Sequence, residues 1–353
     1  MKITRTTPPR PLDVTALFPQ LAPLARTATR LHPVPASPSP RRSSVGGPLL
    51  WPADEPWPHC EGPHEWYGTD PLMPLADLRL LRRIRAAAQG RDFTPQERET
   101  LARIEPPSTY PRPKPSLRPY DGSIALLPLA QLYTRDIPDL RTPAGTDLLQ
   151  VLWCPFDHPP KSYMPRTVLF WRSAAEVTSV LAAPPEPPAV QYQGYLPEPC
   201  LLLPEQITEY PHPSDLSPDI LSLLDDWGRW ESAGDAVDSR YASYPAGFYG
   251  INLSVAPGWK VGGWVSWGLT DPIPQSCPTC DTEMNPLLTI PSHEWGSSDR
   301  SWIPYELQEP MIPTRGGEPR PAQPAAIQIG RGYKQQLYVC PASPEHSHTE
   351  LMQ

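Results

Sequence analysis

Cysteine and histidine residues near the C-terminal end of the sequence have the spacing of metal ligands. Cys277 and Cys280 form a C-x-x-C motif, in which two thiolates can turn onto one tetrahedral zinc ion. Cys340 directly follows an apolar, strand-like run, and His346 and His348 come soon after it. We therefore predict a zinc site in which these three cysteines are joined by one histidine. His346 is favoured because it lies nearer to the end of the strand.

A second group of the same residue types lies in the N-terminal half. Cys60 and His64 precede the central apolar strands of that half, and Cys154 and His158 follow one of them. Two cysteines and two histidines would form a formally neutral zinc site, whereas the three-cysteine site would carry one negative charge. Neither set leaves an open coordination position, which favours structural over catalytic zinc. The sixth cysteine, Cys200, is predicted to be a buried thiol.

Three other interpretations of these residues remain open at the level of the sequence. A C-x-x-C pair can be a thioredoxin-type redox centre, but that motif opens a helix after a strand, and here Pro272 and Pro274 precede it. The cysteines can also be ordinary buried thiols, with the histidines on the surface. In the third interpretation, zinc with an open position serves a hydrolase or transferase between two halves of the chain, with Asp157 or Glu61 as the base.

The elements that must position these residues occur twice along the chain. Each half has a Val-Gly-Gly tripeptide, a tryptophan, a cysteine, a Pro-Leu run that opens an apolar strand, and an apolar strand ending in Cys-Pro. Features repeated in the same order indicate an internal duplication, with two β-rich halves related by a pseudo-twofold axis. The matching segments are Val45–Gly47 and Val261–Gly263, Trp51 and Trp264, Cys60 and Cys277, Pro71–Leu75 and Pro286–Leu288, and Gln150–Pro155 and Gln336–Pro341.

The first half is the longer one, which indicates an insertion. Leu126–Leu132 resembles Pro71–Leu78, so that similar strand-like segments lie on both sides of the inserted segment. The predicted divisions are an N-terminal helix, strand and proline-rich arm over 1–44, a first half over 45–205 with a helical insertion at about 77–123, and a linking helix and second half over 206–353. Both halves are expected to pack as one globule.

Hydrophobic periodicity predicts short elements throughout. Apolar residues at helical spacing predict helices within 12–24, 77–104 and 219–230, and Thr94-Pro95-Gln96-Glu97 has the form of a capping box. Short apolar runs bounded by proline or glycine predict strands. These strands are expected at 28–32, 124–132, 148–153, 168–172, 250–255, 287–290, 325–329 and 335–339.

Proline is the most unusual feature of the composition. The chain has 353 residues, of which 55 are proline, 12 tryptophan and 14 tyrosine. So many prolines exclude a long regular helical bundle, and so many large aromatic side chains argue against disorder. We therefore expect an α+β fold made mainly of antiparallel β-sheet, with a few short helices and many proline-rich loops.

The charge balance indicates which kinds of partner the protein can bind, and the N-terminal residues indicate its cellular compartment. Lys and Arg total 30 while Asp and Glu total 38, a net charge of −8, which argues against binding to nucleic acid or to a membrane surface. No apolar run is long enough to span a membrane, and the first residues lack the apolar stretch of a signal peptide. We therefore expect a cytoplasmic protein, in which cysteines serve as metal ligands or thiols rather than as disulfides.

The sequence lacks the common catalytic motifs, and its tryptophans gather near the cysteines. No G-x-S-x-G, Walker-type or G-x-G-x-x-G segment is present. The ordinary role of the tryptophans is packing within a proline-rich globule. They could instead line an aromatic cleft between the halves that holds a peptide, a proline-rich segment or a sugar. The tryptophans concerned are Trp51, Trp57, Trp66, Trp259, Trp264 and Trp267.

Several of these segments resemble the YwqG-like family, whose domain has no assigned function. Residues 44–52, Ser-Val-Gly-Gly-Pro-Leu-Leu-Trp-Pro, and residues 127–132, Leu-Pro-Leu-Ala-Gln-Leu, are similar to its Gly-Gly-x-Pro-x-x-Pro and Leu-Ala-Gln-Ile pattern. The pattern returns at Lys260–Trp264 and Pro286–Leu288, so that the resemblance covers about residues 12–353, with 77–123 as an insertion. It implies a bacterial, cytosolic α+β protein dominated by antiparallel sheet, and it supplies no catalytic residues.

Together these observations favour a non-enzymatic binding protein that is stapled by zinc. Its partner would be a protein or peptide recognised in the groove between the halves. The acidic balance suits a basic partner, as in an immunity or antitoxin-like protein. The alternative is the zinc-dependent hydrolase or transferase described above. Removal of the metal distinguishes the two, because a structural ion is needed for folding and a catalytic ion is not.

Overall fold

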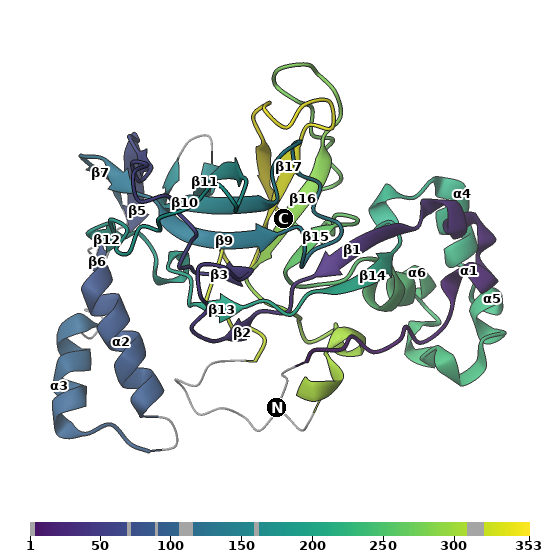
Figure 1. Ribbon diagram of the computed structural model, residues 1–353. Coiled ribbons are helices and arrows are strands. Elements are labelled where there is room, and N and C mark those ends of the chain that lie inside the picture. Colours follow the sequence, from purple (N-terminus) through teal and green to yellow (C-terminus); the bar gives the residue numbers. More distant parts are fainter. Residues whose placement is uncertain (1–3, 69–71, 89–90, 106–115, 159–161, 309–320) are drawn as a thin grey trace.

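Two antiparallel β-sheets of six strands each form the centre of the molecule, with helices at both ends (Figure 1). The computed structural model describes residues 4–68, 72–88, 91–105, 116–158, 162–308 and 321–353. Every strand pair within these residues is antiparallel. The predicted α+β class, mainly antiparallel sheet with a few short helices, is therefore confirmed.

The strands divide into two large sheets and three small ribbons. The C-terminal sheet has the order β14 (Glu205–Glu209), β1 (Arg26–Arg30), β15 (Lys260–Gly262), β16 (Asn285–Pro291), β17 (Lys334–Val339) and β18 (Thr349–Met352). The N-terminal sheet has the order β11 (Ser162–Arg172), β10 (Leu148–His158), β9 (Leu127–Tyr133), β3 (Ser44–Val45), β13 (Cys200–Leu201) and β2 (Val34–Pro35). The ribbons pair β12 (Ala189–Val190) with β6 (Met73–Pro74), β4 (His59–Cys60) with β8 (Ile124–Ala125), and β5 (His64–Gly68) with β7 (Ser116–Tyr120).

The strand order of one large sheet corresponds to that of the other. In the N-terminal sheet, the strand that leads into the first Gly-Gly pair, β3, is followed across the sheet by β9, β10 and β11. In the C-terminal sheet, the strand that leads into the second Gly-Gly pair, β15, is followed by β16, β17 and β18. Two chain segments cross between the sheets: residues 26–35 supply β1 and β2, and residues 200–209 supply β13 and β14.

A single buried cluster takes side chains from both large sheets. Leu129 and Trp153 enter it from the N-terminal sheet, and Leu288 and Leu337 enter it from the C-terminal sheet. Strand β10, next to the edge strand β11, is buried continuously over residues 148–156. A strand covered on both faces needs apolar residues on both, which explains its mainly hydrophobic sequence, interrupted by the buried Gln150.

Helices α2 (Leu75–Ala87) and α3 (Pro95–Ile104) pack side by side at one end of the molecule (Figure 1, lower left). The Thr94 hydroxyl accepts a hydrogen bond from the Glu97 N–H, and the Glu97 carboxylate accepts one from the Thr94 N–H. This confirms the predicted capping box. Residues 89–90 and 106–115 of the predicted insertion lie outside the described residues.

A second group of helices lies at the opposite end (Figure 1, right) and packs around Phe18, Trp230 and Phe248. The helix predicted at 219–230 is two helices, because Asp226 caps the second one through the Gly228 N–H. No helix in the described part of the chain is long and apolar enough to cross a membrane. The helices of this group are α1 (Val14–Leu17), α4 (Pro218–Leu224), α5 (Trp227–Glu231) and α6 (Pro245–Tyr249), with a 3-10 turn at Pro19–Leu24 and a π-helical turn at Gly250–Ser254.

Further short 3-10 turns connect these elements. They lie at Gln193–Tyr195, Pro213–Asp215, Gly234–Ala236, Ser239–Tyr241, Arg300–Trp302 and Tyr305–Leu307. Each spans three residues, as is usual for this tight helix type.

Three strand predictions are wrong in instructive ways. Residues 250–255 continue α6 as a helical turn, because a short apolar run serves a buried helix as well as a strand. Residues 325–329 form no ladder and contribute only an isolated bridge between Ile329 and Tyr333. The Pro-Leu run before residue 78 opens no long strand, because Met73–Pro74 forms only a two-residue strand that pairs with β12 and leads directly into α2.

A buried ion pair supports the Gly-Gly turn after β15. The Lys260 Nζ lies 2.7 Å from each carboxylate oxygen of Glu209, and both side chains are buried. The same carboxylate accepts hydrogen bonds from the N–H groups of Ala256 and Trp264. Gly263 has a φ of 72°, and an added Cβ would collide with the carboxylate, so this position requires glycine.

We expect Glu209→Gln to destabilise the protein strongly, because it leaves the Lys260 ammonium buried without its counter-ion. Breaking a buried ion pair on one side costs about 3–5 kcal/mol of unfolding free energy. Glu186→Gln is the matched control, because Glu186 pairs with Arg79 at the surface, where such pairs contribute about 0–1 kcal/mol. Urea unfolding of both variants measures the difference, and equal losses would contradict the assignment.

Candidate metal centres

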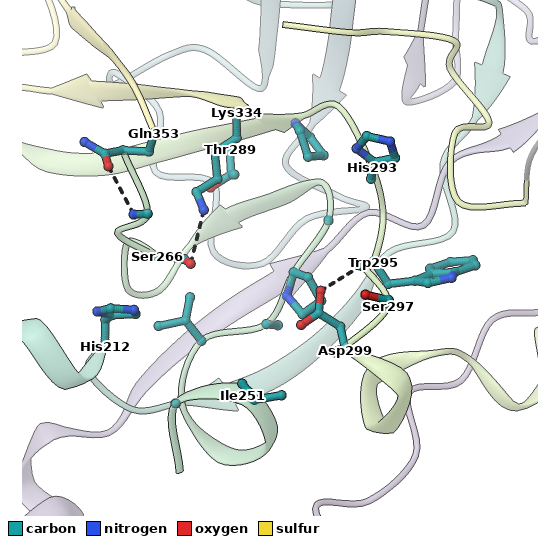
Figure 2. A pocket seen from close by; sticks show the side chains of 18 of the residues that line it. His212, Ile251, Ser266, Thr289, His293, Trp295, Ser297, Asp299, Lys334 and Gln353 are labelled. Carbon is teal, nitrogen blue, oxygen red and sulfur yellow. Dashed lines mark hydrogen bonds between the residues drawn. The ribbon is translucent and has the colours of Figure 1, made fainter. Parts of the chain in front are cut away.

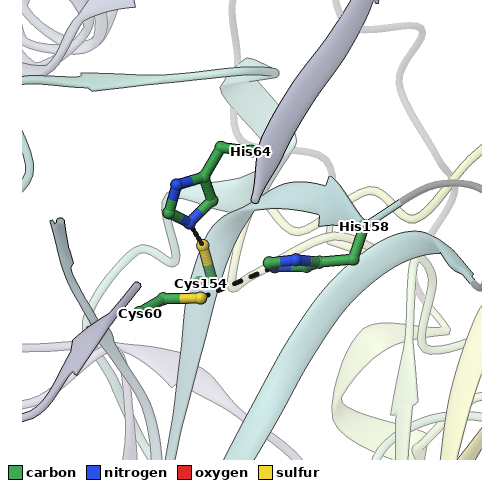
Figure 3. Close-up of side chains that lie close together, drawn as sticks. All are labelled: Cys60, His64, Cys154 and His158. Atoms are coloured by element: carbon green, nitrogen blue, oxygen red, sulfur yellow. Dashed lines mark hydrogen bonds between the residues drawn. The ribbon is translucent and has the colours of Figure 1, made fainter. Parts of the chain in front are cut away.

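The first cluster consists of Cys60, His64, Cys154 and His158, which come from three strands (Figure 3). Cys60 ends β4 and His64 begins β5, so a short loop brings both side chains to one point. Cys154 lies within β10, and His158 ends that strand. Two ribbon strands are thereby placed against β10 of the N-terminal sheet.

The separations within this cluster match those of tetrahedral zinc ligands. Cys154 Sγ lies 3.4 Å from His64 Nε2, and Cys60 Sγ lies 3.9 Å from His158 Nε2. All four candidate ligand atoms lie within 4.8 Å of one another. With Zn–S near about 2.3 Å and Zn–N near about 2.0 Å, a tetrahedron places sulfur and nitrogen ligands about 3.5 Å apart.

The loop between Cys60 and His64 depends on Gly62. Its φ is 81°, a left-handed conformation that glycine adopts without strain. A Cβ at this position would lie 2.8 Å from the His64 backbone nitrogen. Glycine therefore allows the chain to reverse within the few residues that separate the two candidate ligands.

The surroundings of this cluster favour a thiolate. Hydrogen bonding from the Cys154 thiol, with further contributions from His158 and His64, lowers the pKa of Cys60 to about 2. The same interaction with Cys60, together with burial, raises the pKa of Cys154. One thiol therefore ionises readily, and the second needs a cation beside it to lose its proton, which is what a coordinated metal ion provides.

The second cluster consists of Cys277, Cys280, Cys340 and His346. The C-x-x-C turn precedes β16, Cys340 directly follows β17, and His346 lies in the turn before β18. These segments are adjacent because β16, β17 and β18 are neighbours in the C-terminal sheet. The cluster therefore joins the ends of three consecutive strands.

Distances and hydrogen bonds in the second cluster are also those of a metal-binding turn. Cys277 Sγ lies 3.4 Å from His346 Nδ1, and Cys280 Sγ lies 3.5 Å from Cys340 Sγ. The Thr279 N–H donates to Cys277 Sγ over 3.4 Å, an outer interaction that stabilises a thiolate ligand. Hydrogen bonding with Thr282, followed by weaker effects of the other cysteines, lowers the pKa of Cys280 to about 6.

The structure brings all eight predicted ligands together in the two predicted sets, and all six cysteines are free thiols. His348, the alternative to His346, is elsewhere, because its Nε2 lies 2.8 Å from Thr167 Oγ1 on β11. Cys200 is buried apart from both clusters and donates to the Pro324 carbonyl, as expected for a packing thiol.

The two carboxylates considered as catalytic bases have other partners. Asp157 accepts hydrogen bonds from the Tyr195 hydroxyl at 2.7 Å and from the Gln191 amide at 2.8 Å. Glu61 accepts one from the Ser123 hydroxyl at 3.0 Å. Each cluster also offers four candidate ligand atoms, as many as a tetrahedral metal ion takes.

The tryptophans near the cysteines pack within the protein or hydrogen-bond to neighbouring residues. Trp51, Trp57 and Trp66 belong to the buried cluster beside the first metal centre. Trp259 lies in the core between the sheets, Arg26 stacks on Trp264, and the Trp267 indole donates to Asp215. A cavity lined by Lys334 and Ser266, among other residues, has no recognisable motif in the sequence.

No protein-family model and no curated protein matches this sequence. The interpretation of the two clusters therefore depends on their donor atoms, their geometry and the strands that hold them. On these grounds both clusters could hold a metal ion.

Proposed function

We propose that each cluster binds one structural zinc ion and that the chain is a non-enzymatic binding protein whose two large sheets are stapled by these ions. The observation that carries the proposal is the presence of two separate sets of four sulfur and nitrogen ligand atoms, each set within 4.8 Å. Thiolate and imidazole ligands in a tetrahedron select zinc, and four protein ligands are typical of structural sites.

The corresponding strand orders support a duplicated origin of the two halves. In this proposal β3, β9, β10 and β11 are equivalent to β15, β16, β17 and β18. Cys154 and Cys340 then occupy equivalent positions, each four residues beyond a matching glutamine, Gln150 or Gln336. The proposed division is an arm over 1–44, a first half over 45–205 and a second half over 206–353.

A protein or peptide partner and membership of the YwqG-like family complete the proposal. The net charge of −8 suits a basic partner and supports an immunity or antitoxin-like role. A cytoplasmic location agrees with six free thiols, because that compartment keeps cysteines reduced.

Elemental analysis of the purified chain tests the proposal, with about two zinc ions per chain as the expected result. Cysteines bound to metal react slowly with thiol reagents, so native protein should show few reactive thiols and denatured, metal-free protein should show six. Protein without metal in which all native thiols react freely would end the proposal. A single zinc ion would limit it to one cluster, which the thiol count of ligand variants would identify.

A further inference from the structure

A cavity of about 1020 Å³ lies beside the C-terminal sheet, and its lining residues include none of the cysteine and histidine residues of the two clusters (Figure 2). Its floor is formed by the beginning of β17 and the end of β16, and its sides come from the segment after β15 and from the helical turn at 250–254. The volume is at the upper end of the range of small-molecule sites. The walls include the apolar side chains of Ile251, Val255 and Ile303.

Lys334 directs its ammonium group into this cavity. Its Nζ donates a hydrogen bond to Ser266 Oγ over 3.1 Å, as Figure 2 shows. Among the described residues it forms no ion pair. Burial and the nearby Lys260 lower the pKa of Lys334 to about 8, and Asp299 acts weakly in the opposite direction. The amine is therefore mainly protonated at pH 7 and lacks a counter-ion.

His212 offers a second donor in the same cavity. Its Nδ1 accepts a hydrogen bond from the Ser214 N–H, so the proton of the neutral ring is on Nε2. Burial, followed by the charge of Lys334, lowers the pKa of His212 to about 4, and the ring stays neutral at pH 7. An ammonium, an imidazole N–H and the Ser266 hydroxyl thus line one polar cavity.

The corresponding place in the N-terminal sheet is closed and apolar. Leu148 begins β10 as Lys334 begins β17, and Leu50 follows its Gly-Gly pair at the same distance as Ser266 follows the second pair. Leu50 and Leu148 are buried in one cluster with Tyr133, Ala174 and Val177. The same framework therefore accepts leucine at both positions, so the lysine and the serine are not needed to build it.

We propose that this cavity binds a small molecule that bears an oxyanion group, carboxylate or phosphate, with the anion on Lys334, Ser266 and His212 and an apolar body against Ile251, Val255 and Ile303. The lysine then supplies the charge-assisted hydrogen bond, and the bound anion supplies the missing counter-ion. None of these cavity residues belongs to either cysteine cluster.

Calorimetric titration with benzoate, phenyl phosphate and the neutral analogue benzamide tests the site, each at up to about 10 mM, the range suited to ligands of this size. We expect at least one of the anions to bind about tenfold or more tightly than benzamide, because a charged hydrogen bond replaces a neutral one. Which anion binds distinguishes a carboxylate from a phosphate ligand.

Lys334→Leu should abolish the preference for the anion, whereas Lys334→Arg should retain it. Thermal unfolding of Lys334→Leu checks its folding, and Leu148 in the other sheet indicates that leucine is tolerated. The comparison of benzoate with benzamide on the unmodified chain needs no variant at all. Equal binding of anions and benzamide, no binding of either anion, or an undiminished preference in folded Lys334→Leu would overturn the proposal.

Discussion

Removing zinc from the purified chain is expected to unfold it, rather than to leave a folded protein that has lost only a zinc-dependent activity. Each proposed ion joins segments that are distant in sequence, Cys60 and His64 with β10, and the C-x-x-C turn with Cys340 and His346. Structural zinc contributes about 10–16 kcal/mol in small zinc-binding peptides, whereas a whole folded domain has only about 5–15 kcal/mol of net stability. Loss of both ions should therefore exceed the stability of the chain.

Circular dichroism and intrinsic tryptophan fluorescence during treatment with a zinc chelator measure this effect. Trp153 and Trp230 are fully buried, so unfolding should shift their emission to longer wavelengths. The same chelator already saturated with zinc is the control, and addition of zinc should restore the native signal. A metal-free chain that keeps its native fluorescence and thermal transition would contradict structural zinc and favour the hydrolase or transferase interpretation.

The sequence predicted which cysteines and histidines lie together better than it predicted the elements around them. Ligand type and spacing are local properties, so Cys277, Cys280 and the cysteines after matching strands could be recognised without knowing the fold. The repeated order of the segments then indicated which cysteines and histidines should meet. The repeat did not predict how the two clusters differ. In the first cluster Cys60 and His64 lie on two ribbon strands, β4 and β5, whereas the corresponding cysteines of the second cluster lie in a tight turn.

The failed predictions share a physical cause, which is that short apolar runs carry little information about their partners. Residues 250–255 are apolar because they fill the space beside α6, and only the preceding helix determines that they continue as a helical turn. The sequence also does not indicate that Lys334 lies in a cavity, because a lysine at the start of a strand is usually exposed at the surface. Its direction into a cavity follows from the packing of β17 against the segment after β15.

Two histidines in one short segment give the sharpest test of the second metal centre. His346 lies 3.4 Å from Cys277 Sγ, whereas His348 lies against Thr167 on the neighbouring strand β11. We expect His346→Ala to lose one zinc ion per chain and to lower the free energy of unfolding by more than about 4 kcal/mol, as loss of a structural metal does. His348→Ala removes the same side chain two residues away and should keep both ions.

Elemental analysis and urea unfolding of the two variants, prepared in parallel, measure both quantities. His348→Ala loses a partly buried hydrogen bond to Thr167, so a cost of about 0.5–1.5 kcal/mol is expected without any loss of metal. Because stability alone can fall in either variant, the zinc content decides between the histidines. Loss of zinc from His348→Ala, with both ions kept in His346→Ala, would show that His348 and not His346 is the fourth ligand. If both variants kept two ions, neither histidine would be a ligand of the second centre.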